Sequence, residues 1–411
     1  MEETAGVLLD FFIIFVLAKA AAEVFQRVRQ PAVIGELLVG VAIGPHALGL
    51  IDVPLLDTHE GLAMVYEVMA ELGLVVLLFF VGLETRLTDL LRVGGRSLTV
   101  AMLGVALPFA LGTAFMALMG HPRVEALFVG TALVATSVGI TARVLRDLGV
   151  LATREARIIL GAAVADDILA LLALTAVVQI GKEGGVDAGE LVVTAVVAVA
   201  FVTFTAMVGT RVVKRYSLHL ERLRMPNAPL AVALALMLGL SAAAGELGLA
   251  GIVGAFLAGM MLAESREQLQ LERRAQPIYE FLVPFFFVLT GAKVDLGTFG
   301  EGGTLGLALA ITSLAIAGKL LGCGAAGYGL GKRSMAILGI GMVPRGEIGF
   351  VVASIALAQG SIGADVFSSV VFMSIATTLV VPPVLSVLYA GGDGRGRVRP
   401  REKAGRATAA S

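Results

Sequence analysis

Hydrophobic residues follow one another in long runs along this chain, and short polar segments separate the runs. An α-helix needs about 20 mainly apolar residues to cross a bilayer. Runs of that length recur from end to end, and they predict thirteen membrane-spanning helices. The predicted spans are 6–25, 33–50, 63–82, 97–119, 125–147, 155–180, 189–212, 228–245, 249–264, 278–292, 303–328, 335–359 and 363–389. We therefore expect an all-α polytopic membrane protein.

Composition supports this fold class. Of the 411 residues, 57% are hydrophobic and 15% are charged, and the mean hydropathy is +0.92. A soluble domain carries more charge than this. The sequence has no zinc-type Cys/His cluster, no P-loop and no dinucleotide-binding fingerprint. We expect a protein that lies in the lipid bilayer, is not an enzyme, needs no cofactor and binds no nucleic acid.

The basic residues predict the orientation in the membrane. One set of alternate loops, together with the C-terminal tail, holds 25 Lys and Arg residues, whereas the opposite set holds 3. Loops rich in Lys and Arg stay in the cytoplasm. We expect a multi-pass protein of the cell (inner) membrane with its N-terminus outside and its C-terminus in the cytoplasm.

Few charged residues fall within the predicted helices. Asp166 and Asp167 interrupt the apolar run GAAVADDILALLAL of the sixth helix, and Lys319 lies in the middle of the eleventh. One charge at bilayer depth costs about 2.5–3.5 kcal/mol on insertion scales, so such residues are usually functional or tightly paired. Arg345 and Glu347 lie close together in the twelfth helix, and we expect them to form a structural charge pair.

Two pairs of similar segments predict an internal repeat. VIGELLVG in the second helix resembles IVGAFLAG in the ninth, and LFFVGLETRL in the third resembles FFFVLTGAKVDL in the tenth. Both pairs are seven helices apart, and an odd shift reverses the direction of a helix in the membrane. The sequence predicts two inverted six-helix repeats joined by a linker helix, which is typical of alternating-access transporters.

Transporters of this kind hold ions where a helix of each half is broken near the midplane. In the fifth helix, ALVATSVGITARVL is small and polar at its centre, with Thr136 and Ser137. In the twelfth, GMVPRGEIGF has Pro344 between two glycines, which breaks a helix strongly. We expect these two broken helices to cross near the midplane, close to the charged residues of the sixth and eleventh helices.

These motifs, in this order, resemble those of the monovalent cation:proton antiporter superfamily, and most of all the bacterial sodium/proton antiporters of the double-aspartate NapA type. The resemblance covers nearly all of residues 1–390. It implies that Asp167 is the main ion-binding carboxylate, that Asp166 also contributes to the Na⁺ site and pairs with Lys319, and that Thr136 and Ser137 lie in the unwound segment beside the ion.

The resemblance also implies a homodimer in which one helix unit moves against another. The implied units are a dimerisation unit (1–95 and 216–298), a core unit (96–181 and 299–390), a linker helix (182–215) and a basic disordered cytoplasmic tail (391–411).

Elementary chemistry agrees with an exchange of ions at this place. Desolvation favours the neutral form of a carboxyl group, so Asp167 could hold either a proton or a hard monovalent cation, and the competition couples the two. If Lys319 also loses its proton when sodium binds, two protons exchange for one Na⁺ and transport is electrogenic. Glu67 and Glu71, toward the outer face, could form a solvated funnel or interface contacts. The expected role is pH homeostasis.

Other functions fit parts of the pattern. A potassium/proton antiporter has the same fold, and the sequence does not decide between Na⁺, Li⁺ and K⁺. A sodium-coupled symporter of organic anions has a related fold but does not need a buried lysine beside two aspartates. A cation channel is opposed by the repeats and by the titratable cluster. An intramembrane protease would draw its two acids from different helices.

Overall fold

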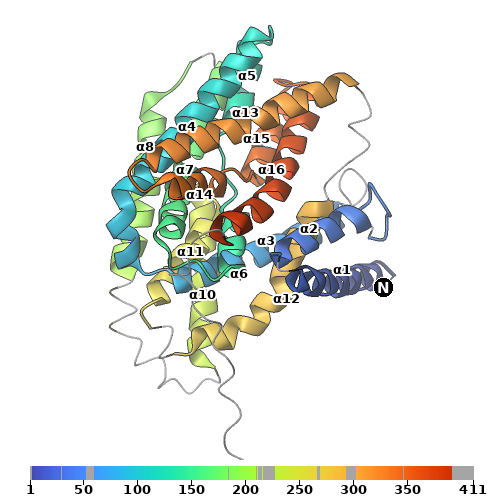
Figure 1. Cartoon of the computed structure of the whole chain (residues 1–411), viewed down its shortest axis with the longest axis vertical. Coiled ribbons are helices and arrows are strands. Elements are labelled where there is room, and N and C mark those ends of the chain that lie inside the picture. Colours follow the sequence, from blue (N-terminus) through green and yellow to red (C-terminus); the bar gives the residue numbers. More distant parts are fainter. Residues whose placement is uncertain are drawn as a thin grey trace, which may run out of the picture.

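The computed structural model describes residues 2–28, 30–51, 60–183, 185–209, 211, 215, 227–265, 269–292, 302–345 and 347–390. The predicted tail at 391–411 lies outside the described residues. The regular elements of the described part are helices (Figure 1). They are α1 (Glu2–Arg27), α2 (Ala32–Ile43), α3 (Glu60–Glu84), α4 (Leu87–Leu118), α5 (Arg123–Ala132), α6 (Val138–Asp147), α7 (Arg154–Glu183), α8 (Ala188–Phe204), the π-helical turn η1 (Thr205–Gly209), α10 (Ala228–Glu246), α11 (Gly251–Leu262), α12 (Leu271–Ala292), α13 (Gly302–Ala326), α14 (Lys332–Gly341), α15 (Glu347–Ala358) and α16 (Ala364–Ala390).

Length and surface chemistry identify a membrane protein. Nine of the described helices are long and apolar enough to cross a bilayer, and α2 and α11 are shorter apolar helices. Large hydrophobic side chains are exposed along these helices, for example Val192, Val196 and Val199 of α8. Such a surface is stable against lipid tails, where the helical backbone satisfies its own hydrogen bonds. The chain is a polytopic all-α membrane protein.

Several predicted spans differ from the helices found. The spans at 97–119 and 278–292 belong to helices that begin earlier, at Leu87 and Leu271. The span expected at 33–50 is helical only to Ile43, because Pro45 follows and the chain then turns back on itself through Gly49, whose φ is +58°. The span at 125–147 is divided into α5 and α6, and the span at 335–359 into α14 and α15.

The helices pack in two groups, and in Figure 1 most of the first group lies in the lower half and most of the second in the upper half, with α6 and α11 between them. The first group contains α1, α2, α3, α10, α11 and α12, with close packing of α3 on both α11 and α12. The second contains α4, α5, α6, α7, α13, α14, α15 and α16, with α4 packed between α7 and α13. Helix α6 also touches α2 and α3, so it connects the two groups.

Glycines allow the closest contacts in the first group. A Cβ added to Gly40 of α2 would collide with the Val288 carbonyl oxygen of α12, and one added to Gly82 of α3 would collide with the Phe256 carbonyl oxygen of α11. Only glycine permits backbones to approach so closely. The same kind of contact thus occurs once between α2 and α12 and once between α3 and α11.

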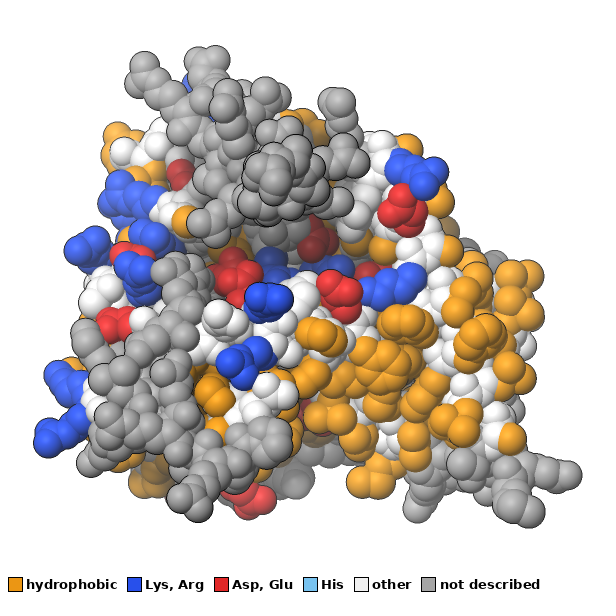
Figure 2. Space-filling model, turned by 90° about the horizontal axis from the view of Figure 1, so that it is seen from below, with side chains coloured by type: hydrophobic (Ala, Val, Ile, Leu, Met, Phe, Trp, Pro, Cys, Tyr) orange, Lys and Arg blue, Asp and Glu red, His pale blue; other side chains and the backbone are white. Residues whose placement is uncertain are grey.

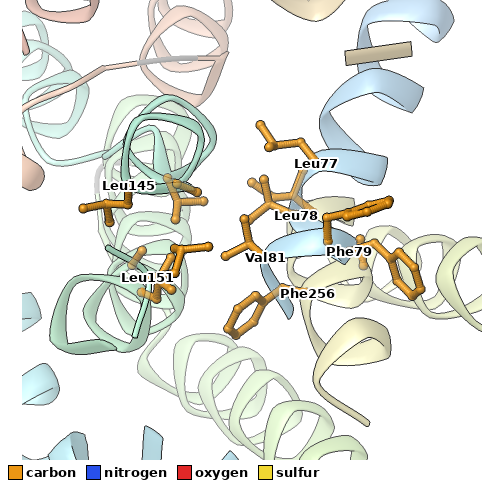
Figure 3. Packing of buried hydrophobic residues seen from close by; sticks show 14 of the residues in the cluster. Leu77, Leu78, Phe79, Val81, Leu145, Leu151 and Phe256 are labelled. Atoms are coloured by element: carbon orange, nitrogen blue, oxygen red, sulfur yellow. The ribbon is translucent and has the colours of Figure 1, made fainter. Parts of the chain in front are cut away.

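A buried hydrophobic cluster fills the space between the groups. In Figure 3, Leu78 and Val81 of α3, with Phe256 of α11, lie opposite Leu145 and Leu151 of the second group. Seen from below, the molecule has a broad field of hydrophobic side chains on the side of α1, and acidic and basic side chains gather in a central hollow (Figure 2).

Candidate functional site

The two helix breaks lie against each other and share hydrogen bonds. The backbone N–H of Ser137 donates to the Pro344 carbonyl oxygen at 2.7 Å, and the Thr141 hydroxyl donates to the Gly341 carbonyl oxygen at 2.7 Å. The Thr136 hydroxyl donates to the carbonyl oxygen of Met342 at 3.3 Å. Backbone groups freed by a break inside a membrane must find partners within the protein. Here each break supplies partners for the other.

Arg345 completes this arrangement. Its side chain is almost wholly buried, and Nη1 donates to the carbonyl oxygens of Val134 and Ala135 at 3.1 and 2.8 Å. These are free carbonyls beyond the C-terminal end of α5, where a positive charge is favoured. The sequence predicted a charge pair between Arg345 and Glu347. The side chain of Glu347 lies outside what the structure describes, so that pair stays a prediction, and no local pattern predicts the contacts of Arg345 with the Val134 and Ala135 carbonyls.

A buried ion pair lies beside the crossed breaks. Lys319 Nζ of α13 donates to Asp166 Oδ1 of α7 at 2.8 Å, and both side chains are fully buried. A buried pair of this kind is stable only while both partners are present, because removing one leaves an uncompensated charge. The second oxygen, Asp166 Oδ2, and the buried hydroxyl of Ser137 have no hydrogen-bond partner among the described residues.

Asp167 lies at a cavity. Adjacent residues of a helix point about 100° apart, so while Asp166 meets Lys319, Asp167 lines a cavity of about 680 Å³. Ser137 and Arg345 line the same cavity. Carboxylate and hydroxyl oxygens are the ligands that hard cations prefer. Asp167 and Ser137 therefore bring two oxygen-bearing side chains to one cavity, whereas Asp166 and Thr136 are not among its lining residues.

The cavity opens toward one side of the molecule. Glu67 and Glu71, both exposed on the N-terminal half of α3, line it, as do residues 248–251 between α10 and α11. By the orientation predicted from the basic loops, this is the outer side. Hydroxyl groups that the sequence analysis did not single out also line the cavity, namely those of Thr290, Ser374 and Thr378. No sequence signal separates them from the many other Ser and Thr residues of the helices.

Comparison with known proteins agrees with the class that the fold defines, a polytopic all-α membrane protein. The family model described as "Sodium/hydrogen exchanger, transmembrane" matches residues 12–390. The chain belongs to this sodium/hydrogen exchanger family.

Several members are similar along nearly their whole length. The chain is 34% identical to the high-affinity Na⁺/H⁺ antiporter NhaS3 of Synechocystis sp., over 94% of this chain and 90% of the relative. It is 35% identical to the Na⁺/H⁺-K⁺ antiporter GerN of Bacillus cereus, over 93% and 96%. The solved structure of the sodium proton antiporter MjNhaP1 from Methanocaldococcus jannaschii superimposes with a TM-score of 0.67 at 16% identity, over 95% of this chain and 98% of that one, and shows the same fold.

Proposed function

We propose that this protein exchanges sodium for protons across the cell membrane by alternating access. The observation that carries the proposal is Asp167, which lies at the base of a one-sided cavity and directly beside the buried Asp166–Lys319 pair. A carboxylate in this position can hold a proton or a cation, and the two compete. Membership of the sodium/hydrogen exchanger family and the names of the similar antiporters support the same activity.

The roles of the individual residues belong to this proposal. Asp167 binds Na⁺ or H⁺, Asp166 contributes its second oxygen, and Thr136 and Ser137 form the polar wall of the broken helix. Lys319 releases its proton when sodium binds and recovers it when a proton replaces sodium, so two protons move against one Na⁺. The resulting exchange is electrogenic.

The wider architecture is proposed on the same basis. Thirteen spans in two inverted repeats, with the C-terminus in the cytoplasm, agree with the basic loops and with the paired glycine contacts of α2 with α12 and α3 with α11. The group of α1–α3 and α10–α12 serves as a dimerisation unit, and the group of α4–α7 and α13–α16 moves as a core unit. We keep the double-aspartate NapA type as the proposed subfamily.

Transport in proteoliposomes tests the activity. A pH gradient is imposed, Na⁺, Li⁺ or K⁺ is added in turn, and a pH-sensitive dye is followed for the wild type and for Asp167→Asn. Asp89→Asn is the matched control, because Asp89 forms an ion pair with Arg157 at 3.0 Å and does not line the cavity. We expect cation-triggered proton movement in the wild type and the control but not in Asp167→Asn. Absence of proton movement with every cation, in folded wild-type protein, would refute antiport and favour a symporter or a channel.

Potassium/proton exchange is the second candidate. One similar protein, at 35% identity, is named for both Na⁺ and K⁺. The oxygen ligands around Asp167 suit either ion. The response to K⁺ in the same experiment decides between the two.

A further inference from the structure

The cavity that reaches Asp167 from one side is closed on the other. On that second side, Asp167 borders a narrow space of only about 10 Å³, and its lining is apolar apart from Asp167. Leu78 and Phe256 of the first helix group meet Val138 and Ala163 of the second group there. Alternating access requires this contact between the groups to open.

Two arginines lie farther along the same contact. Arg143 and Arg146 are three residues apart on α6, so they share one face of that helix. Both belong to the 25 basic residues that predict the cytoplasmic side, but Arg143 is buried and the side chain of Arg146 is only 14% exposed. Their partners lie on α2, α3 and α12 of the first group.

Arg143 reaches two helices of that group. Its Nη2 donates to Glu36 Oε1 of α2 at 3.3 Å, and its Nη1 donates to the hydroxyl oxygen of Tyr279 of α12 at 2.9 Å. Its Nε donates to Asp147 Oδ2 at 3.0 Å, which holds the guanidinium in position from its own helix. Glu36 is buried, and Arg143 is the ion-pair partner that compensates its charge at short range.

Arg146 reaches the third helix. Its Nε donates to Glu84 Oε1 at the end of α3 at 3.0 Å, and its guanidinium carbon lies 4.0 Å from the centre of the Tyr279 ring. A cation above an aromatic ring is attracted to it. We name Arg143, Arg146, Glu36, Glu84 and Tyr279 the arginine clasp.

The clasp and the cavity mouth lie toward opposite ends of α3. Glu71 lines the cavity and Glu84 ends the helix 13 residues later, a rise of roughly 20 Å at 1.5 Å per residue. Figure 2 shows acidic and basic side chains gathered in a central hollow of the lower face of the molecule. From the cavity mouth toward the other side, the order is the cavity, Asp167, an apolar contact and then the clasp.

We propose that the arginine clasp is the gate on the side opposite the cavity, and that its charged contacts favour the conformation in which the cavity is open. This inference rests on the proposed alternating-access exchange. Charge-assisted hydrogen bonds between two moving groups stabilise the state in which they form and are lost in the other. Water that enters from the second side would then hydrate Glu36 and both arginines.

Thiol labelling tests the clasp without measuring transport. The one native cysteine, Cys323, is buried and is replaced by alanine. Single cysteines are placed at Ala163, next to the narrow apolar space, and at Ala70, which lines the cavity. A membrane-impermeant methanethiosulfonate reagent is applied to right-side-out and to inside-out vesicles.

With the clasp intact, we expect Ala70→Cys to react from the mouth side and Ala163→Cys to be protected from both sides. Arg146→Gln, alone and with Arg143→Gln, should increase labelling of Ala163→Cys from the clasp side at least about tenfold, because loss of one charge-assisted hydrogen bond shifts an equilibrium by that factor. Labelling of Ala70→Cys from the mouth side should fall in the same variants.

Arg157→Gln is the matched control, because Arg157 pairs with Asp89 inside the second helix group. Labelling of the clasp variants equal to this control, or increased equally from both sides, would overturn the proposal.

The charge-reversed pair Arg146→Glu with Glu84→Arg should restore protection, and failure to do so would contradict the role of that contact. Glu84→Gln removes the same contact from the other partner and should act like Arg146→Gln if the arginine variants do not fold. Loss of transport with the expected labelling pattern would count against the proposed function and not against the clasp.

Discussion

At the scale of single residues, two neighbouring aspartates have different surroundings. Asp166 is fully buried against Lys319, and Asp167 lines a large cavity. Their adjacent positions on one helix predict that the two side chains point in different directions. The apolar run around them predicts that both lie deep within the bilayer. The contact of Lys319 with Asp166 agrees with the pairing that the resemblance implies, while the roles of all three residues in transport remain predictions.

Removing one partner of the buried pair should destabilise the protein. Lys319→Gln leaves Asp166 without its countercharge, which costs about 3–5 kcal/mol in comparable buried pairs. Asp166→Asn combined with Lys319→Gln should recover most of this loss, because no uncompensated charge remains. Thermal unfolding of the purified protein measures both variants. A double variant no more stable than Lys319→Gln would contradict the pairing.

The same lysine should control the electrical character of transport. In Lys319→Gln protein that remains folded, the second proton has no carrier, so exchange should no longer respond to membrane voltage. Flux in proteoliposomes clamped with valinomycin and potassium measures this. Voltage-dependent exchange that persists in the variant would exclude Lys319 as the second proton carrier.

Competition at Asp167 predicts a simple dependence on pH. If a single carboxyl group holds either H⁺ or Na⁺, acidification raises the apparent KM for Na⁺ by up to about tenfold per pH unit, because protonated sites cannot bind the cation. The maximal rate should change less than KM. Initial rates at several Na⁺ concentrations and pH values provide the measurement, and a KM independent of pH would contradict competition at one site.

At the scale of elements, the breaks of α5–α6 and α14–α15 arise differently. Pro344 and its flanking glycines make the second break predictable from sequence, since proline cannot continue the hydrogen-bond ladder. The first break contains no proline, and small polar residues alone only suggest it. Tertiary contacts stabilise that break, namely those of Arg345 with the Val134 and Ala135 carbonyls. Such contacts join residues about 210 positions apart, and a local pattern does not reveal them.

Glycine contacts between helices should be sensitive to the smallest side chain. Gly40→Ala forces α2 away from α12 and should lower the apparent stability by about 1–3 kcal/mol, as overpacking does elsewhere. Gly239→Ala in α10 is the matched control, because no atom lies within 4 Å of the added Cβ and alanine favours a helix. Thermal unfolding compares the two. Equal effects would show that helix propensity, and not close packing, determines the result.

At the scale of the whole molecule, the alternation of apolar runs with short polar segments was sufficient to predict an all-α polytopic membrane protein, and the resemblance of particular motifs indicated its family. Periodicity did not predict which helices pack together, because membrane helices are apolar on all sides. The arginines of α6 count among the basic residues that predict the cytoplasmic side, and no local pattern predicts their contacts with three other helices. A charged residue near the end of an apolar run can lie at the membrane–water interface or in a buried contact between helices, and the sequence pattern is the same in both cases.

The orientation can be tested with two exposed positions. Gly185 lies between α7 and α8, and Tyr328 lies between α13 and α14 with 81% of its surface exposed. Cysteines at these positions, with Cys323 replaced by alanine, should react with an impermeant thiol reagent from opposite sides of the membrane. We expect Gly185→Cys to react from outside and Tyr328→Cys from the cytoplasm. The reverse result would contradict the orientation, and reaction from the same side would contradict the number of spans between them.

The hydrogen bonds shared by the two helix breaks have a consequence for biosynthesis. Thr136 and its acceptor at Met342 are 206 residues apart. A ribosome adding about 5–20 residues per second needs on the order of tens of seconds to synthesise that length. During this interval the Val134 and Ala135 carbonyls lack Arg345, so the segment between α5 and α6 either continues as a helix or breaks with its carbonyls unpaired. The final geometry of the first break therefore forms only after the second half has been inserted, so the ion site is completed late in biosynthesis.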